Sequence, residues 1–210
     1  MSKFILFDVG ANLGQDSIPV VTKNPNAEAW VFEPMPAFCD HINQLSKNFQ
    51  DRYHLYPLAM SDYDGESTFY VATSEVGFSN GANSLYPFVD HLNETWPGRI
   101  DLKTEREITV QVTRFDTWYR ENNLNLERID YFHCDTQGSD LKVLQGMGDL
   151  VHLIQKGVVE CARDERAKLY AENHTMKEME DFLLSKGFVI TNRQSNDAWS
   201  NELNLYFEKR

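Results

Sequence analysis

Residues 7–17 read Phe-Asp-Val-Gly-Ala-Asn-Leu-Gly-Gln-Asp-Ser, and this stretch decides the fold. It completes a nearly continuous apolar run over residues 3–9, which is typical of a parallel strand covered on both faces. Gly10 and Gly14 then let the backbone turn tightly and enter a helix from about residue 14. A turn of this kind between a strand and a helix indicates a nucleotide site.

The glycine spacing and the neighbouring acid discriminate between nucleotide ligands. The spacing is GxxxG, whereas GxGxxG is the pattern that seats a pyrophosphate on a helix N-terminus. Asp8 would direct a negative charge at the site, which disfavours a diphosphate and favours a ligand with an ammonium group and a sulfonium centre. We therefore expect S-adenosylmethionine rather than NAD, although a bare GxxxG is common outside cofactor sites.

Strands and helices alternate along the rest of the chain. We expect core strands at residues 27–32, 53–60, 129–134 and 158–160, helices at 37–49, 114–121, 139–145 and 176–186, and closing strands at 188–191 and 203–207. This order predicts an α/β fold with a doubly wound sheet whose last strand runs antiparallel.

One stretch interrupts the alternation. Residues 74–106 are rich in Gly, Pro, Asn and Ser, with a short helix expected at 88–92, and we interpret them as a lid-like insertion in a single domain over residues 1–210. The lid's Asn83 and Ser84 are candidates for binding the acceptor. Its aromatic residues could stack on a sugar ring or pack the loop against the core.

The amino-acid composition indicates which kind of molecule the protein acts on. The net charge of −12 disfavours nucleic acid, whose binding depends on Lys and Arg. Three cysteines without CxxC spacing indicate reduced thiols, and no apolar run is long enough to span a membrane. With no signal-like start, we expect a cytoplasmic protein that acts on a small molecule.

Acidic residues follow the expected strands. Glu33 comes 23 residues after Gly10, where an acid contacts ribose hydroxyls in α/β nucleotide folds, although it could also be a solvated strand end. Ser61 and Asp62 stand where the adenine amino group needs an acceptor, or form a simple turn.

Asp135 and Glu160 end the fourth and fifth core strands. The carboxyl ends of parallel strands share one edge, so we expect the two carboxylates to lie together and to take a proton from an acceptor hydroxyl. The alternatives are donor positioning for Asp135, and a helix cap or an ion pair with Arg163 for Glu160. No HxH or HExxH spacing is present, so we predict no metal.

Several motifs together resemble the FkbM-type methyltransferases. They are FDVGANLGQDS, VFEPMPAF, LAMSDYDGESTFY, TRFDTWYREN, IDYFHCDTQGSDLKVLQGM, VVECARDE and LLSKGF, in family order from residue 4 to about 190. The resemblance implies a Rossmann-like class I methyltransferase with a seven-stranded sheet and O-methylation of a sugar or natural-product hydroxyl.

The resemblance also implies the site. The expected donor-binding residues are Asp8, Gly10, Asn12, Gly14, Asp16, Ser17, Glu33, Ser61, Asp62, Asp135 and Gln137, and those facing the transfer site are Asp135, Gln137 and Glu160. The chain departs from the family pattern at His133-Cys134-Asp135, where Lys-Ile-Asp is common, and it lacks the usual helical segment before the first strand. Two alternatives stay open: an NAD-dependent oxidoreductase, or a nucleotide-binding module without turnover.

Overall fold

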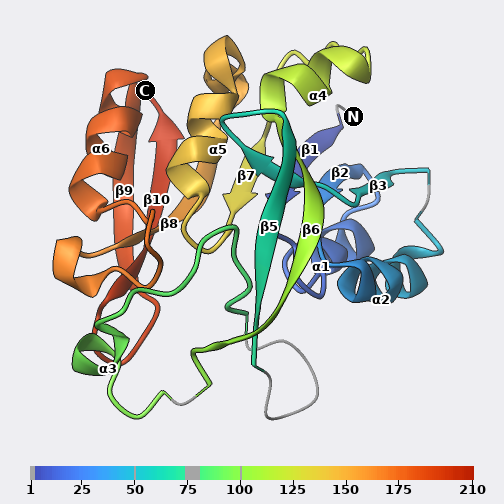
Figure 1. Ribbon diagram of the computed structural model, residues 1–210. Coiled ribbons are helices and arrows are strands. Elements are labelled where there is room, and N and C mark those ends of the chain that lie inside the picture. Colours follow the sequence, from blue (N-terminus) through green and yellow to red (C-terminus); the bar gives the residue numbers. More distant parts are fainter. Residues whose placement is uncertain (1–2, 50, 74–80, 100) are drawn as a thin grey trace.

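The computed structural model describes residues 3–49, 51–73, 81–99 and 101–210, and its centre is a seven-stranded sheet (Figure 1). The strand order is β3-β2-β1-β7-β8-β10-β9. The strands are β1 (Phe4–Val9), β2 (Ala27–Phe32), β3 (Tyr53–Tyr56), β7 (Tyr131–Cys134), β8 (Lys156–Ala162), β9 (Phe188–Ser195) and β10 (Glu202–Lys209). β10 is antiparallel to both of its neighbours, and the other pairings are parallel. The predicted α/β class and the antiparallel terminal strand are therefore confirmed.

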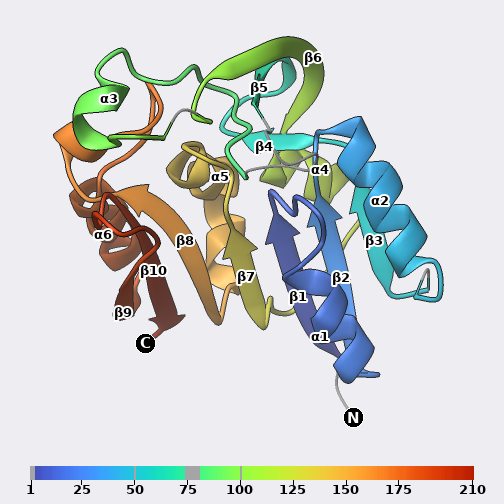
Figure 2. The ribbon, with the colours of Figure 1, turned by 90° about the horizontal axis from the view of Figure 1, so that it is seen from below.

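Helices cover both faces of this sheet. On one face, α1 (Ser17–Lys23) and α2 (Pro36–Ser46) bury Val21 and Ile42 against β1 and β2 (Figure 2). On the other face, α4 (Phe115–Glu121), α5 (Asp140–Gly146) and α6 (Met176–Ser185) enclose the largest apolar cluster, which includes Phe7, Phe32 and Trp118. A strand buried on both faces needs continuous apolar residues, which explains the sequence of β1.

Local signals fix where the helices begin. Pro36 at the first position of α2 suits a site where the N–H has no helical partner. α6 begins with a capping box, in which Thr175 and Glu178 each bind the other's backbone N–H.

A second, three-stranded sheet with the order β4-β6-β5 lies across the carboxyl ends of the first. It consists of β4 (Ala59–Ser61), β5 (Gly65–Ala72) and β6 (Thr104–Arg114). The single strand predicted at residues 53–60 is wrong, because β3 ends before Pro57 and β4 joins the other sheet. Proline has no N–H to continue a ladder, which accounts for the break.

The predicted insertion is partly described. Residues 74–80 and 100, with the aromatic Phe78, lie outside the described residues, and the last residues of the insertion already belong to β6. The short helix is α3 (Leu92–Thr95) rather than residues 88–92. The backbone of Ser84 pairs with that of Tyr70 in β5, and the backbone of Phe88 pairs with that of Tyr170. The segment is therefore anchored both to the three-stranded sheet and to the chain around residue 170.

None of the helices formed by the described residues combines the length and apolar character that crossing a membrane requires.

Candidate active site

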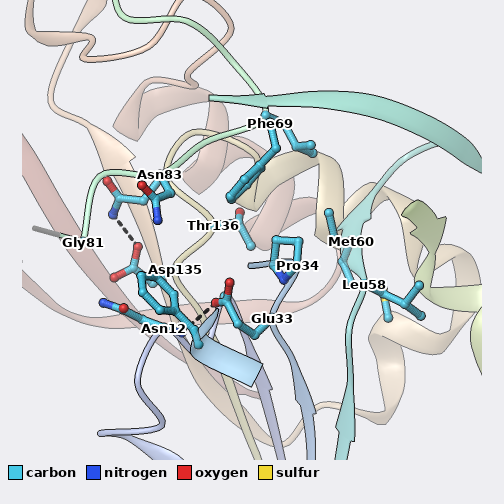
Figure 3. Close-up of a pocket in the computed structure, with 15 residues that line it drawn as sticks. Asn12, Glu33, Pro34, Leu58, Met60, Phe69, Gly81, Asn83, Asp135 and Thr136 are labelled. Carbon is cyan, nitrogen blue, oxygen red and sulfur yellow. Dashed lines mark hydrogen bonds between the residues drawn. The ribbon is translucent and has the colours of Figure 1, made fainter. Parts of the chain in front are cut away.

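A cleft with about 490 Å³ of empty space, part of it open to solvent, lies at the carboxyl ends of β1, β2 and β7 (Figure 3). Strand order reverses between β1 and β7, and open α/β sheets bind ligands at such a switch point. The cleft is lined by Gly10, Asn12, Glu33, Pro34, Phe38, Leu58, Ala59, Met60, Phe69, Gly81, Asn83, Leu85, Asp135, Thr136 and Gln137.

The turn after β1 forms one wall of the cleft. Gly10 has φ of +82°, and a Cβ at this position would overlap the carbonyl oxygen of Asp135. Only glycine therefore lets the β1 and β7 exits approach this closely. Asn12 follows in the left-handed region with φ of 50°, a conformation that asparagine tolerates better than most residues.

Glu33 joins β2 to this turn. Its Oε2 accepts the N–H of Asn12 at 2.8 Å and its Oε1 accepts that of Met35 at 2.7 Å. Burial raises the pKa of Glu33 to about 8, although these two backbone N–H groups oppose the rise. Figure 3 shows the carboxylate between Asn12 and Pro34, at the edge of the cleft.

Asp135 also lines the cleft, and one side-chain amide links it to Glu160. Gln137 Nε2 lies 2.6 Å from Asp135 Oδ1 and 2.9 Å from Glu160 Oε2. Asn196 donates to the other oxygen of Glu160. The structure thus brings together the two carboxylates that the sequence predicted to be neighbours.

Burial dominates the ionisation of this pair. It raises the pKa of Asp135, against the lowering effect of the Gln137 hydrogen bond. It raises the pKa of Glu160 well above the ordinary range, and the charge of Asp135 adds to the effect. A raised pKa suits a group that must accept a proton near neutral pH.

Asp8 does not line this cleft. It is fully buried, and its Oδ1 lies 2.8 Å from Nδ1 of His133 on the adjacent strand β7. Both residues line a second hollow, together with Asp16. The negative charge of Asp8, which we expected to face the methyl donor, is therefore paired with His133. The carboxylates that face the cleft are those of Glu33 and Asp135.

Four other expected donor-binding residues lie outside the cleft lining. Gly14 packs on Ile18, and Ser17 shares a hydrogen bond with Tyr53. Ser61 is buried, and its carbonyl oxygen lies against Gly146. The carbonyl oxygen of Asp62 accepts a hydrogen bond from the Arg114 side chain. Their contact with the donor stays a prediction.

The two predicted acceptor residues hold the described part of the lid. Asn83 lines the cleft, and its side-chain oxygen accepts the N–H of Ala72. Ser84 is buried and donates to the carbonyl oxygen of Gln137 over 2.6 Å.

Sequence reasoning missed the apolar half of the cleft. Phe38 of α2 and Phe69 of β5 line it together with Leu58, Met60 and Leu85. It also missed Asn196, which reaches Glu160 from the β9–β10 loop, and Tyr170, which binds Gln137. The amphipathic period of α2 and the alternation in β5 were the available signals for the two phenylalanines, whereas none pointed to Asn196.

The cleft fits a nucleoside with a charged amino-acid tail. Asn12 Oδ1 is buried and has no hydrogen-bond partner within the described part of the chain, so it is available to a donor group such as ammonium. Each carboxylate oxygen of Glu33 accepts one backbone N–H and can accept a further hydrogen bond, which suits the ribose hydroxyls. The apolar wall suits a base. No group of three or more potential metal ligands occurs among the described residues.

The model of one protein family, described as the methyltransferase FkbM domain, matches residues 8–190. The curated relatives include the 2-O-methyltransferase NoeI of Sinorhizobium fredii, 28% identical over 144 residues, which cover 68% of this chain and 56% of NoeI. They also include the AMB antimetabolite synthetase AmbE of Pseudomonas aeruginosa, 25% identical over 215 residues, which cover 90% of this chain and 10% of AmbE. The chain thus spans about half of one relative and a tenth of the other.

Solved structures share the fold at low identity. The magnesium protoporphyrin IX methyltransferase ChlM from Synechocystis PCC 6803 with bound SAH has a TM-score of 0.52 and 10% identity, covering 100% of this chain and 75% of ChlM. Aeropyrum pernix fibrillarin with natively bound S-adenosyl-L-methionine has a TM-score of 0.51 and 9% identity, covering 98% and 66%.

Proposed function

The chain belongs to the FkbM methyltransferase family, whose methyl donor is S-adenosylmethionine, and from this premise we propose that it methylates a hydroxyl group of a small-molecule or carbohydrate acceptor. Membership in a methyltransferase family disfavours the NAD-dependent oxidoreductase. The relative NoeI is a 2-O-methyltransferase, which supports an oxygen acceptor.

The observation that carries the proposal is the pair of carboxylates beside the cleft. Asp135 lines the cleft, and the same amide group of Gln137 holds it together with Glu160, which is buried outside the cleft lining. Bound S-adenosylmethionine supplies a methyl group already activated by its positive sulfur. The task left to the protein is to orient a hydroxyl and to accept its proton, and buried carboxylates with raised pKa values suit it.

Each wall has its own role in this proposal. Glu33 would accept hydrogen bonds from the ribose hydroxyls, and Asn12 would contact the amino-acid tail. Phe38 and Phe69 would enclose the base. Asn83, on the described part of the lid, would orient the acceptor.

A two-step experiment tests the proposal. Thermal stabilisation by S-adenosylhomocysteine, with NADH as the comparison ligand, tests the donor. Radiolabelled S-adenosylmethionine is then screened against monosaccharides, oligosaccharides, phenols and amines. We expect label transfer to a hydroxyl compound. Transfer only to amines would overturn the proposed acceptor class, and donor binding without any transfer would favour the non-catalytic alternative.

A further inference from the structure

Tyr170 connects the lid to the carboxylate pair. The residue is completely buried, and its ring stacks on Phe88 of the lid with a centroid distance of 5.3 Å and an interplanar angle of 23°. The backbone of Phe88 also pairs with that of Tyr170. A Cβ at Gly138 would also come within 3.2 Å of the ring. The ring therefore has little freedom to move.

The hydroxyl of Tyr170 points at the side chain of Gln137. Its oxygen lies 2.6 Å from Gln137 Oε1 and 3.2 Å from the carbonyl oxygen of Ala82. Burial, and then the charges of nearby carboxylates, raise the pKa of Tyr170 well above its ordinary value. The phenol therefore keeps its proton and acts as a donor.

The chemistry of the neighbouring groups determines which end of the Gln137 amide faces the two carboxylates. An ionised Asp135 only accepts hydrogen bonds, and the Gln137 nitrogen lies 2.6 Å from its Oδ1, so the nitrogen end of the amide must face the carboxylate pair. The amide oxygen must then face a donor, and the Tyr170 hydroxyl is in that place. The reversed amide would set its oxygen against the ionised Asp135, which has no proton to donate, and the phenol could then donate only to the Ala82 carbonyl at 3.2 Å.

We propose that Tyr170 is a positioning residue, which holds the Gln137 amide so that both of its N–H groups donate to the carboxylate pair. The inference rests on the proposed function, because it gives the pair a role in the transfer. It also explains why Gln137, with φ of 55°, is held on two sides, by Tyr170 at its amide and by Ser84 at its carbonyl. Docking of the lid and orientation of the carboxylates are then coupled through one hydroxyl.

The Tyr170→Phe variant separates this role from simple packing. It keeps the ring that stacks on Phe88 and removes only the hydroxyl. Tyr119→Phe is the matched control, because it removes a tyrosine hydroxyl that binds the N–H of Leu126, outside the cleft lining.

The first readout is hydrogen exchange of the two Gln137 side-chain N–H protons, measured by nitrogen-15 NMR and assigned by their loss in Gln137→Met. In Tyr170→Phe we expect exchange to accelerate by about tenfold or more, because the amide can rotate away from the carboxylates. Calorimetric affinity for S-adenosylhomocysteine should stay within about threefold, since Glu33 and Asn12 are untouched. Unchanged exchange in Tyr170→Phe, or equal acceleration in Tyr119→Phe, would overturn the inference.

The second readout is turnover on the acceptor that the screen identifies. Tyr170→Phe should lower kcat about tenfold in the wild-type background and have no further effect in Gln137→Met. Additive losses in the double variant would show that Tyr170 does not act through Gln137. If the screen finds no acceptor, the proposed function fails, whereas the exchange result still decides whether Tyr170 orients the amide.

Discussion

His133 Nδ1 lies 2.8 Å from Asp8 Oδ1, across the adjacent parallel strands β7 and β1. Asp8 is fully buried and the side chain of His133 is 18% exposed, and the pair lines the second hollow together with Asp16. Burial alone would lower the pKa of His133, but the hydrogen bond and charge of Asp8 outweigh it and raise the pKa to about 9. His133 therefore provides a cation at neutral pH.

This pair predicts a pH-dependent stability. The folded-state pKa of about 9 lies above the ordinary value of 6.5, so the stabilisation is complete below pH 6.5 and is lost as the pH rises through 9. His133→Asn keeps a donor near Nδ1 but carries no charge. The difference in unfolding free energy between wild type and this variant, from urea titrations, should shrink by roughly 3 kcal/mol between pH 6 and 9.5. A difference independent of pH would contradict the ion pair.

Gly10 is expected to tolerate no side chain. Gly10→Ala would combine a positive φ with overlap on the Asp135 carbonyl, whereas Gly187→Ala has a similar φ of +87° and open space around its Cβ. The control should lose about 1 kcal/mol of stability, and Gly10→Ala about 3 kcal/mol or more. Equal losses in denaturant titrations would mean that close approach of the two strand exits is not what requires glycine.

Donor affinity should rise with pH. Burial raises the pKa of Glu33 to about 8, and the positively charged donor with its ribose hydroxyls prefers the ionised carboxylate. The affinity for S-adenosylmethionine, measured by calorimetry, should increase by up to about tenfold per pH unit from pH 6 to 8 and level off above. Glu33→Gln removes the titrating group and should remove this rise. A flat profile in the wild type would argue against Glu33 as a donor contact.

Asp135→Asn and Glu160→Gln should affect turnover far more than donor binding. We expect turnover to fall about a hundredfold or more, since a positioned base commonly contributes that much, while affinity for S-adenosylhomocysteine falls only modestly. Glu165→Gln, which changes an exposed carboxylate paired with Lys168, is the control. Wild-type turnover in both variants would remove the proposed base.

Much of this site could be predicted from local sequence, because it follows strand ends. The GxxxG turn and the distance to Glu33 placed Gly10, Asn12 and Glu33 together, and strand order brought Asp135 beside them. The same logic did not bring Ser61 to the cleft: Ala59 and Met60 of the same strand line it, whereas Ser61 is fully buried with its backbone against Gly146.

Other features depend on tertiary contacts that no local pattern encodes. The residue pattern of β1 does not show whether the Asp8 side chain faces the cleft. Its pairing with His133 on the neighbouring strand β7 is a tertiary contact that only the structure reveals. Phe69 reaches the cleft because β5 and β6 fold over the sheet edge, and Tyr170 reaches Gln137 because the lid pairs with a distant segment. Long-range pairings of this kind cannot be read from periodicity.

The central claim is that the cleft between the exits of β1, β2 and β7 binds the methyl donor through Glu33. The most direct measurement is calorimetric titration of S-adenosylhomocysteine into wild type and Glu33→Ala, with Glu28→Ala at the opposite end of β2 as the control. We predict an affinity about a hundredfold weaker in Glu33→Ala, equivalent to roughly 3 kcal/mol for two hydrogen bonds to a charged group, and near-wild-type affinity in the control. Unchanged binding by folded Glu33→Ala would contradict this assignment of the donor site.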